Sequence, residues 1–181
     1  MQNNFLKNKK IILSAGASGI GLATVKLLLS QGAFVYTCDI DKKNINKLKK
    51  NSYFNKKLFI SECDASKEDE VKKFYKEISY KTKKIDGLIN NIGIAGPTSP
   101  LEKIKSDDWE KTIHVNVNSH FYFTKYAIPM IKKSKNGSII NISSTAGIDG
   151  FPNRSPYAAS KWALVGTVSY THLTLPTINW V

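Results

Sequence analysis

The sequence predicts an α/β fold in which a parallel, doubly wound sheet carries helices on both faces. Short apolar runs of strand length alternate along the chain with longer segments whose apolar residues recur at helical spacing. A glycine-rich turn joins the first such run to the first helical segment, and the last helical segment begins with a Ser-Pro pair. The 181 residues and their 41% hydrophobic content suit one domain with a sizeable core.

The first strand is expected at Lys10 to Ser14, an apolar run that leads into glycines. The turn Ala15-Gly16-Ala17-Ser18-Gly19-Ile20-Gly21 follows it, and residues 22–30 then show helical apolar spacing. Strand, glycine turn and helix in this order form a corner where backbone N–H groups and the positive helix end face a pyrophosphate. The candidate cofactor-binding residues in this turn are Ser14, Gly16, Ser18, Gly19, Ile20 and Gly21.

The second strand, Phe34 to Asp39, ends in a carboxylate 18 residues after Gly21. A carboxylate at this place can accept hydrogen bonds from both ribose hydroxyls of NAD, and it repels the extra phosphate of NADP. No lysine or arginine adjoins Asp39 to offset that repulsion, since Ile40 and Asp41 follow it. The sequence therefore favours NAD as the cofactor.

The next unit of the alternation is expected between residues 41 and 82. A lysine-rich helix at 41–51 precedes a strand at Leu58 to Glu62, and a helix packed on the sheet is expected at 66–82. Asp64 comes just after this strand, where it could bind an adenine edge. A helix-capping role together with Ser66 explains it almost as well, and both interpretations stay open.

The fourth strand is expected at 85–90 and is followed by Asn90-Asn91-Ile92-Gly93. The amides and the glycine of this segment suit a strand end beside a nucleotide, which makes Asn91 and Gly93 candidate cofactor contacts. A long helix is expected at 109–131. It holds Asn116 among apolar neighbours, which indicates a buried polar contact, although a solvated side chain is the ordinary alternative. The fifth strand, at 138–142, leads directly to Ser144.

Tyr157 and Lys161 are expected one turn apart on one face of the last helix, which starts at Ser155. A phenol has a pKa of about 10 in water, and an ammonium group one turn away lowers that pKa. Tyr157 would then exchange a proton with an alcohol or carbonyl oxygen, which Ser144 could hold. Taken alone, such a pair is more often an amphipathic surface pair than a catalytic one.

Composition narrows the possible partners. The net charge of +13 invites a nucleic-acid hypothesis, but the lysines are scattered and Arg154 is the one arginine, so we interpret the charge as solvated helix faces. Cys38 and Cys63 lack neighbours at metal-ligand spacing, which predicts packed, reduced thiols and no metal site. No apolar run approaches the ~20 residues of a membrane span, and the N-terminal one is too short for a secretory signal. The default expectation is the cytoplasm.

Over about residues 9–166 the chain resembles the classical short-chain dehydrogenase/reductase family. The family's motif Thr-Gly-x-x-x-Gly-x-Gly is matched by Ser14-Ala15-Gly16-Ala17-Ser18-Gly19-Ile20-Gly21, with Ser-Ala in place of Thr-Gly. Its Asn-Asn-Ala-Gly is matched by Asn90-Asn91-Ile92-Gly93, in which Ile92 takes the place of a methyl side chain. The resemblance implies a Rossmann-type fold, a nicotinamide cofactor and an alcohol/carbonyl interconversion by hydride transfer.

The resemblance also implies an active site of Asn116, Ser144, Tyr157 and Lys161. The 13-residue interval to Tyr157 selects Ser144 rather than Ser143 as the family's serine. By resemblance, Tyr157 is the acid/base, and Lys161 lowers its pKa and binds the nicotinamide ribose. Ser144 orients the substrate oxygen, and Asn116 holds a water in the proton relay.

The expected partner is a small alcohol or ketone, with neither nucleic acid nor a membrane involved. Family analogy implies a homodimer or homotetramer. A noncatalytic NAD(H)-binding module is the alternative if Ser14-Ala15 or Ile92 spoils the nicotinamide position. The identity of the substrate does not follow, because residues 88–101 and 147–154 supply only part of the pocket wall.

The last segment, residues 167–181, departs from the resemblance. It holds four threonines and a proline but no acid or lysine, which is poor material for an amphipathic helix. Val168 to Thr177 match one reading frame of a transposase-end sequencing adapter, whose later bases give Val181 and a stop codon. The sequence therefore predicts an incomplete NAD-binding domain at 1–166, truncated after the fifth strand and the start of the next helix, and a non-native tail at 167–181. We expect such a chain to be poorly folded or inactive, because an apolar sheet edge stays uncovered.

Overall fold

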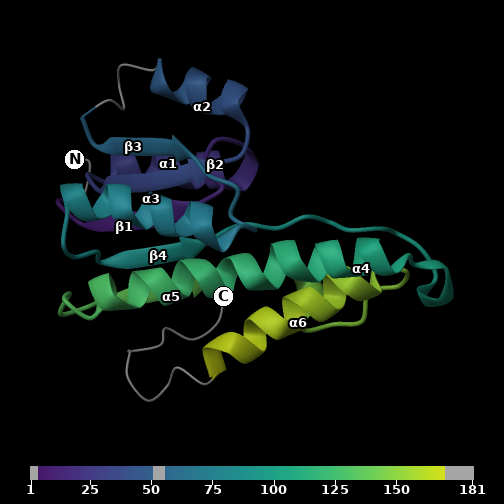
Figure 1. The fold of residues 1–181 in the computed structure, drawn as a ribbon. Coiled ribbons are helices and arrows are strands. Elements are labelled where there is room, and N and C mark those ends of the chain that lie inside the picture. Colours follow the sequence, from purple (N-terminus) through teal and green to yellow (C-terminus); the bar gives the residue numbers. More distant parts are fainter. Residues whose placement is uncertain (1–3, 51–55, 170–181) are drawn as a thin grey trace.

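One parallel sheet organises the molecule (Figure 1). The computed structural model describes residues 4–50 and 56–169. The described strands lie in the order β3-β2-β1-β4-β5, and every neighbouring pair is parallel. Their bounds are β1 Lys10–Ser14, β2 Phe34–Asp39, β3 Leu58–Glu62, β4 Gly87–Asn90 and β5 Ser138–Asn141. The strand order reverses between β1 and β4, which is where doubly wound sheets bind ligands. The predicted α/β fold is confirmed.

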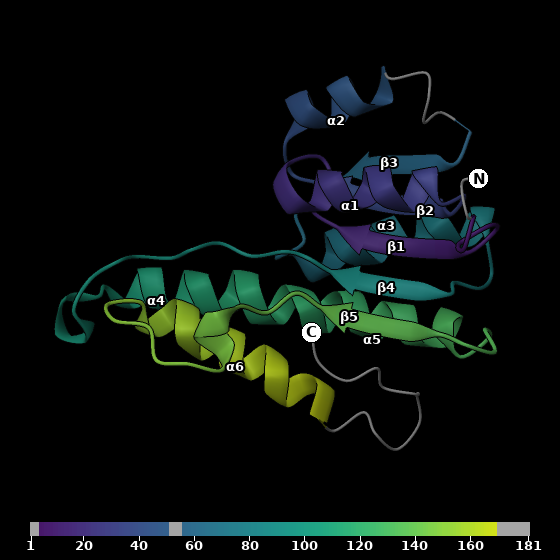
Figure 2. The same cartoon turned by 180° about the vertical axis from the view of Figure 1, so that it is seen from behind.

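Helices cover both faces of the sheet, as Figures 1 and 2 show from opposite sides. One face carries α1 (Gly19–Ser30), and the other carries α3 (Glu68–Lys81) and α5 (Ser119–Ile131). The short helix α2 (Lys42–Lys49) flanks β3. Beyond the sheet, α4 (Ser106–Ile113) continues the rod of α5, and α6 (Ser155–Ser169) packs against it. Short 3-10 turns lie at Leu101–Lys103 and Thr145–Gly147, and a π-helical turn at His114–Asn118 joins α4 to α5.

The central strand β1 shows why the sheet is covered twice. Ile12 and Leu13 are both fully buried, and as neighbours in a strand they point to opposite faces. Ile12 joins the cluster under α3 and α5 with Phe74 and Phe123, whereas Leu13 packs with Val25 under α1. A strand buried on both faces reads as an unbroken apolar run, which is the pattern that predicted it.

The helix boundaries differ from the expected ones. The first helix begins at Gly19 rather than at residue 22, so its first turn belongs to the glycine motif itself. The helix expected at 109–131 begins at Ser106 and is interrupted by a π-helical turn at His114–Asn118. The helix α6 continues to Ser169, past the expected boundary at Gly166. The rest of the predicted tail, residues 170–181, lies outside the described residues.

No helix in the described part of the chain is long and apolar enough to cross a membrane.

Candidate active site

The glycine turn after β1 is shaped by close backbone approaches. A Cβ atom at Gly16 would stand 2.1 Å from Thr37 Oγ1, and one at Gly21 would stand 1.9 Å from the carbonyl oxygen of Ala15. Ala15 replaces the family's glycine and adopts a φ of 55°, which glycine adopts more easily. Ala15 therefore holds a left-handed backbone conformation, which costs about 1 kcal/mol of conformational free energy for a residue with a Cβ atom.

Ser14 and Asn91 hold this turn against β4. Ser14 is fully buried, and its hydroxyl accepts a hydrogen bond from the Asn91 backbone N–H at 2.9 Å. The side-chain amide of Asn91 donates to the carbonyl oxygens of Ser14 at 3.3 Å and Ala15 at 3.1 Å. Both predicted cofactor contacts thus support the turn from the protein side. Ser18, Gly19 and Ile20 are the exposed members of the turn.

The carboxylate of Asp39 lies beside the same turn. The residue is 9% exposed, and its Oδ2 accepts a hydrogen bond from the Ala17 backbone N–H at 2.9 Å. Its Oδ1 accepts from the Asp41 N–H at 3.1 Å. These two bonds fix the side chain at the carboxyl end of β2, and each oxygen keeps a further lone pair for another donor.

Asp64 has the capping contacts that the sequence left as one of two interpretations. Its Oδ1 accepts hydrogen bonds from the Ser66 N–H and hydroxyl, at 3.0 and 2.6 Å, and its Oδ2 lies 3.5 Å from Lys67 Nζ. Partial burial opposes ionisation, but the bonds from Ser66 and Lys67 lower the pKa of Asp64. The Asp64 side chain organises the entry to α3, and its backbone N–H donates to Glu70 Oε2 at 2.8 Å. The adenine contact stays a prediction.

Asn116 occupies the centre of the π-helical turn and is completely buried. Its Oδ1 accepts from the Ile94 N–H at 2.7 Å, and its Nδ2 donates to the Ile94 carbonyl at 3.0 Å and to the Ser160 hydroxyl at 2.9 Å. One side chain therefore joins the loop after β4, the long helical rod and α6. The extra residue of the π turn redirects this position inward.

Lys161 projects from α6 into the same region. It is 4% exposed, and its Nζ donates to the Ile142 carbonyl at 2.9 Å. The Nζ lies 5.6 Å from the centre of the Tyr157 ring. Burial lowers the pKa of Lys161. A Cβ atom at Gly93 would stand 3.4 Å from this Nζ and 3.6 Å from Asn116 Oδ1, so Gly93 leaves open the space between the two side chains.

Comparison with known proteins places this arrangement in a family. The family model described as short chain dehydrogenase matches residues 9–178. The chain belongs to the short chain dehydrogenase family. The match continues past residue 166, where the resemblance in the sequence ended.

Curated relatives and solved structures agree with the family. A 3-oxoacyl-(acyl-carrier-protein) reductase of Thermotoga maritima is 36% identical, with 89% of this chain and 65% of the relative covered. A 3beta-hydroxysteroid dehydrogenase of Mediterraneibacter gnavus is 35% identical, with 88% and 58% covered. A short chain dehydrogenase of Escherichia coli complexed with NADPH shares the fold at a TM-score of 0.88 and 23% identity, with 94% and 73% of the two chains covered. The chain spans about three fifths of the length of these two curated relatives.

Two serines of this short chain dehydrogenase follow β5, and the structure separates their roles. The Ser143 hydroxyl donates to the Lys161 carbonyl at 3.0 Å and so fastens α6 to the strand end. The Ser144 oxygen accepts from the Ala146 N–H at 3.2 Å. Since Ser144 accepts that bond, its own O–H is left to donate elsewhere.

Arg154 is a neighbour of the site that the sequence did not single out. Its guanidinium lies 5.1 Å from the centre of the Tyr157 ring and donates to Thr98 Oγ1 at 3.0 Å and to the Ala95 carbonyl at 2.9 Å. The Ser99 N–H also donates to the Asn153 carbonyl. Arg154 thus joins the loop before α6 to the loop after β4 and covers one side of Tyr157. A lone arginine just before the Tyr157 helix is the signal that could have pointed to it.

His120 is a second neighbour that the sequence analysis missed. It is 2% exposed, and its Nε2 lies 2.9 Å from the Ile92 carbonyl. Burial, together with the charge of Lys161, lowers its pKa to about 4 in spite of this bond. The imidazole is therefore neutral near pH 7, with Nε2–H as the donor. It holds the Ile92 to Gly93 segment from the helix side.

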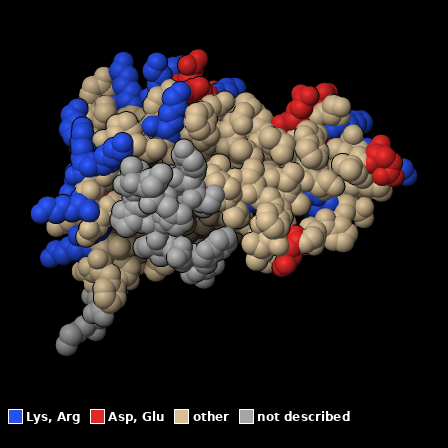
Figure 3. All heavy atoms as spheres, turned by 90° about the horizontal axis from the view of Figure 1, so that it is seen from below, with Lys and Arg blue, Asp and Glu red and all other residues tan. Residues whose placement is uncertain are grey.

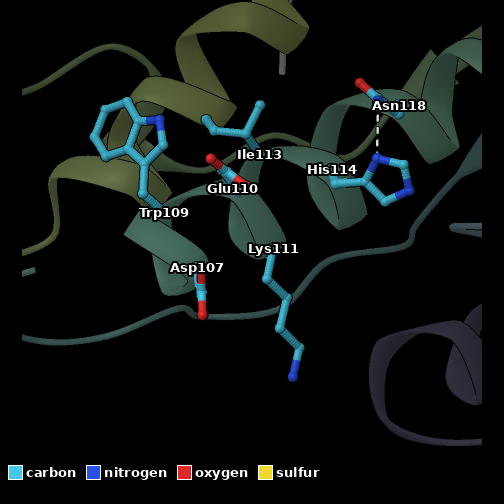
Figure 4. Close-up of a pocket in the computed structure, with 7 residues that line it drawn as sticks. All are labelled: Asp107, Trp109, Glu110, Lys111, Ile113, His114 and Asn118. Atoms are coloured by element: carbon cyan, nitrogen blue, oxygen red, sulfur yellow. Dashed lines mark hydrogen bonds between the residues drawn. The ribbon is translucent and has the colours of Figure 1, made fainter. Parts of the chain in front are cut away.

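A separate hollow lies on the outer side of α4 and the π turn (Figure 4). The residues that line it are Asp107, Trp109, Glu110, Lys111, Ile113, His114 and Asn118. None of the predicted site residues is among them. In Figure 4 the side chain of His114 bonds Asn118 rather than pointing at a common centre with the charged groups. The hollow is therefore not the candidate active site.

Proposed function

We propose that this chain carries the cofactor site and catalytic groups of an NAD-dependent oxidoreductase that interconverts an alcohol and a carbonyl. The observation that supports this proposal is the buried Lys161 beside Tyr157, with Asn116 fixed below them. Burying a lysine without a carboxylate partner is costly. A positive charge buried at Lys161 beside the phenol of Tyr157 would favour the ionised form of that phenol, which suits proton transfer.

Each side chain then has one task. Tyr157 gives a proton to the substrate oxygen or takes one from it. The ammonium group of Lys161 stabilises the negative charge that develops on the phenol oxygen. The Ser144 O–H donates to the same substrate oxygen. Both side-chain N–H groups of Asn116 already donate hydrogen bonds, so Asn116 would hold a relay water by accepting a hydrogen bond at one of its carbonyl oxygens.

The residues at the glycine turn fit a dinucleotide. Helix α1 begins at Gly19, and its N-cap residue Ser18 makes no side-chain capping bond, so the first N–H groups of the helix are available to a phosphate. A Cβ at Gly19 would meet no atom within 4 Å. Asp39 would bind the adenosine ribose, Gly93 and Lys161 would adjoin the nicotinamide end, and NAD would supply the hydride acceptor. The fixed carboxylate of Asp39 favours NAD over NADP, although a structural relative was solved with NADPH.

The experiment is a Tyr157→Phe substitution in the protein, assayed with short alcohols and ketones and both cofactors. We expect kcat to fall by about 10²–10⁴-fold while NADH binding, followed by fluorescence, is unchanged. An unaltered rate would refute the role of Tyr157. If the unsubstituted protein binds NADH but turns over no alcohol or ketone, this would instead support the alternative function, a noncatalytic NAD(H)-binding module.

The cofactor preference is measured in the same assay. We expect kcat/KM to be higher with NAD than with NADP, and Asp39→Ser to reduce that difference. A large advantage of NADP in the parent protein would contradict the role given to Asp39.

A further inference from the structure

The segments that lead into the five strands meet at the end of the sheet opposite the candidate active site. The strands are parallel, so all of them begin at this one edge. The leading segments are residues 4–9, 31–33, 56–57, 82–86 and 132–137. In Figure 1 they lie at the left, on the side of the N-terminus.

Hydrogen bonds connect these segments into one continuous face. The Leu6 N–H donates to the Gln31 carbonyl at 3.2 Å, and Lys57 Nζ donates to the Gly32 carbonyl at 3.1 Å. Asp86 joins the other segments, because its carboxylate accepts from the Lys10 N–H at 2.9 Å and from the Ser134 hydroxyl at 2.7 Å. These bonds hold the described residues of the face to one another and to the sheet.

This face is almost purely cationic. The leading segments hold nine lysines, and their one acidic residue is Asp86, whose oxygens are engaged by the bonds just described. All the other acidic residues of the chain except Glu77 lie at the carboxyl ends of the strands or in the segments that follow them. Figure 3 shows the result: blue side chains gather at the left end of the view, where the strands begin, and most red ones lie toward the other end. We name the nine lysines the lysine rim: Lys7, Lys9, Lys56, Lys57, Lys83, Lys84, Lys132, Lys133 and Lys135.

Most charges of the lysine rim are unpaired. At the opposite end of the sheet, Lys42 pairs with Glu62, Lys67 with Asp64 and Glu70, and Lys125 with Glu68. Within residues 4–50 and 56–169, no side-chain hydrogen bond or ion pair engages the ammonium groups of six exposed rim lysines: Lys7, Lys56, Lys83, Lys132, Lys133 and Lys135. Lys103, Lys105 and Lys111 at the opposite end also make no ion pair within the described residues, so the two ends differ in how many carboxylates stand among the lysines.

Two aromatic side chains stand out of the same face. Phe5, in the turn before β1, is 78% exposed, and Tyr80, in the last turn of α3 before β4, is 76% exposed. Aromatic rings among lysines suit the boundary between headgroups and acyl chains, where the ring enters the boundary and the charges meet anionic lipids.

The sequence led us to expect no membrane contact, but the position of these charges points to one. We propose that the lysine rim is a peripheral docking surface for a membrane that contains anionic phospholipids. Lysine is a compact charge on a flexible stem, which suits a diffuse anionic plane, whereas the reading of base edges favours the planar fork of arginine. The one arginine, Arg154, lies at the other end and is bonded to the loop after β4. Docking by the lysine rim leaves the carboxyl ends of the strands facing away from the lipid. This proposal is independent of the reaction proposed above.

The test is co-sedimentation of the full chain with vesicles of phosphatidylcholine alone or with added phosphatidylserine. We expect binding only to the anionic vesicles, and weaker binding as the salt concentration rises toward physiological strength. Replacing Lys83, Lys133 and Lys135 together by Gln should lower the partition coefficient on the order of 100-fold, since each lysine near the surface contributes roughly fivefold. The matched control neutralises three exposed lysines at the other end, Lys103→Gln, Lys105→Gln and Lys111→Gln, and should change binding by less than about fivefold.

A Lys→Arg triple variant at the same rim positions keeps the charge, and it should keep binding. Equal losses in the rim and control triples would overturn the proposal, because the attraction would then follow net charge alone. The absence of binding to phosphatidylserine vesicles by the parent chain would overturn it too. Tighter binding to a DNA duplex than to the vesicles at the same salt concentration would show a nucleic-acid surface instead.

Discussion

Replacing Gly21 by Ala should damage both stability and cofactor binding, because the glycine turn has no room for a side chain there. The added Cβ would stand 1.9 Å from the Ala15 carbonyl oxygen and 2.7 Å from Asn91 Nδ2. A normal C···O contact is about 3.3 Å, so the backbone of the turn must move by more than about 1 Å. Overpacking of this kind costs about 1–3 kcal/mol.

The expected result is a melting temperature lower by roughly 3–10 °C, since 1 kcal/mol shifts Tm by about 2–4 °C in a chain of this size. Dinucleotide affinity should fall by at least about tenfold, because the displaced turn no longer points its N–H groups at the phosphates. Thermal unfolding followed by circular dichroism measures the first effect, and NADH fluorescence titration measures the second.

Gly150→Ala is the matched control. A Cβ at Gly150 would meet no atom within 4 Å, so the same methyl group should change neither measurement beyond about 0.5 kcal/mol. If Gly21→Ala melts and binds NADH like the parent, the close approach of the turn is absent in solution and the reasoning fails.

Two further predictions concern the buried polar groups beside Tyr157. Asn116→Ala should lower the free energy of unfolding by about 2–4 kcal/mol in denaturant titrations, since it leaves the Ile94 N–H and carbonyl without partners. The control Asn118→Ala should lower it by less than about 1 kcal/mol. Equal losses in the two variants would contradict the bonding of Asn116. The second prediction is a loss of stability at acid pH. The pKa of His120 is lowered to about 4 in the folded state, so the unfolded chain binds more protons than the folded one between about pH 6.5 and 4. The free energy of unfolding should therefore fall by up to about 3 kcal/mol as the pH drops through that range. Parallel melts of a His120→Gln variant should show a flatter dependence, and an unchanged slope would refute the assignment.

The strands show how far sequence reasoning reached. β1, β2 and β3 have the predicted bounds, because an apolar run that leads into a glycine-rich turn or ends in a carboxylate specifies a buried parallel strand locally. The glycine turn, Asp39 and the pair Tyr157 and Lys161 were also legible, since their spacing along the chain sets which end of a strand or face of a helix they occupy.

The π-helical turn around Asn116 could not be predicted from the spacing of residues along the chain. Its cause is tertiary: the side chain bonds the loop after β4 and the Ser160 hydroxyl of α6, which are both distant in sequence. His120 and Arg154 became visible for the same reason, because the Ile92 carbonyl and the loop after β4 that bonds Arg154 meet them only in the folded chain. The capping bonds from Ser66 to Asp64 are confirmed, and the adenine contact of Asp64 stays a prediction.

The charged residues show most plainly what the sequence determines and what only the tertiary structure decides. The sequence by itself determined that the chain is strongly cationic and rich in lysine, and it suggested scattered solvated charges. Only the tertiary structure decided where those charges stand. Parallel strands begin at one edge, so leading segments that are far apart in sequence become neighbours, and their lysines accumulate there. The same topology brings the glycine turn, Asp39 and Asn91 together at the opposite edge, where the candidate active site lies.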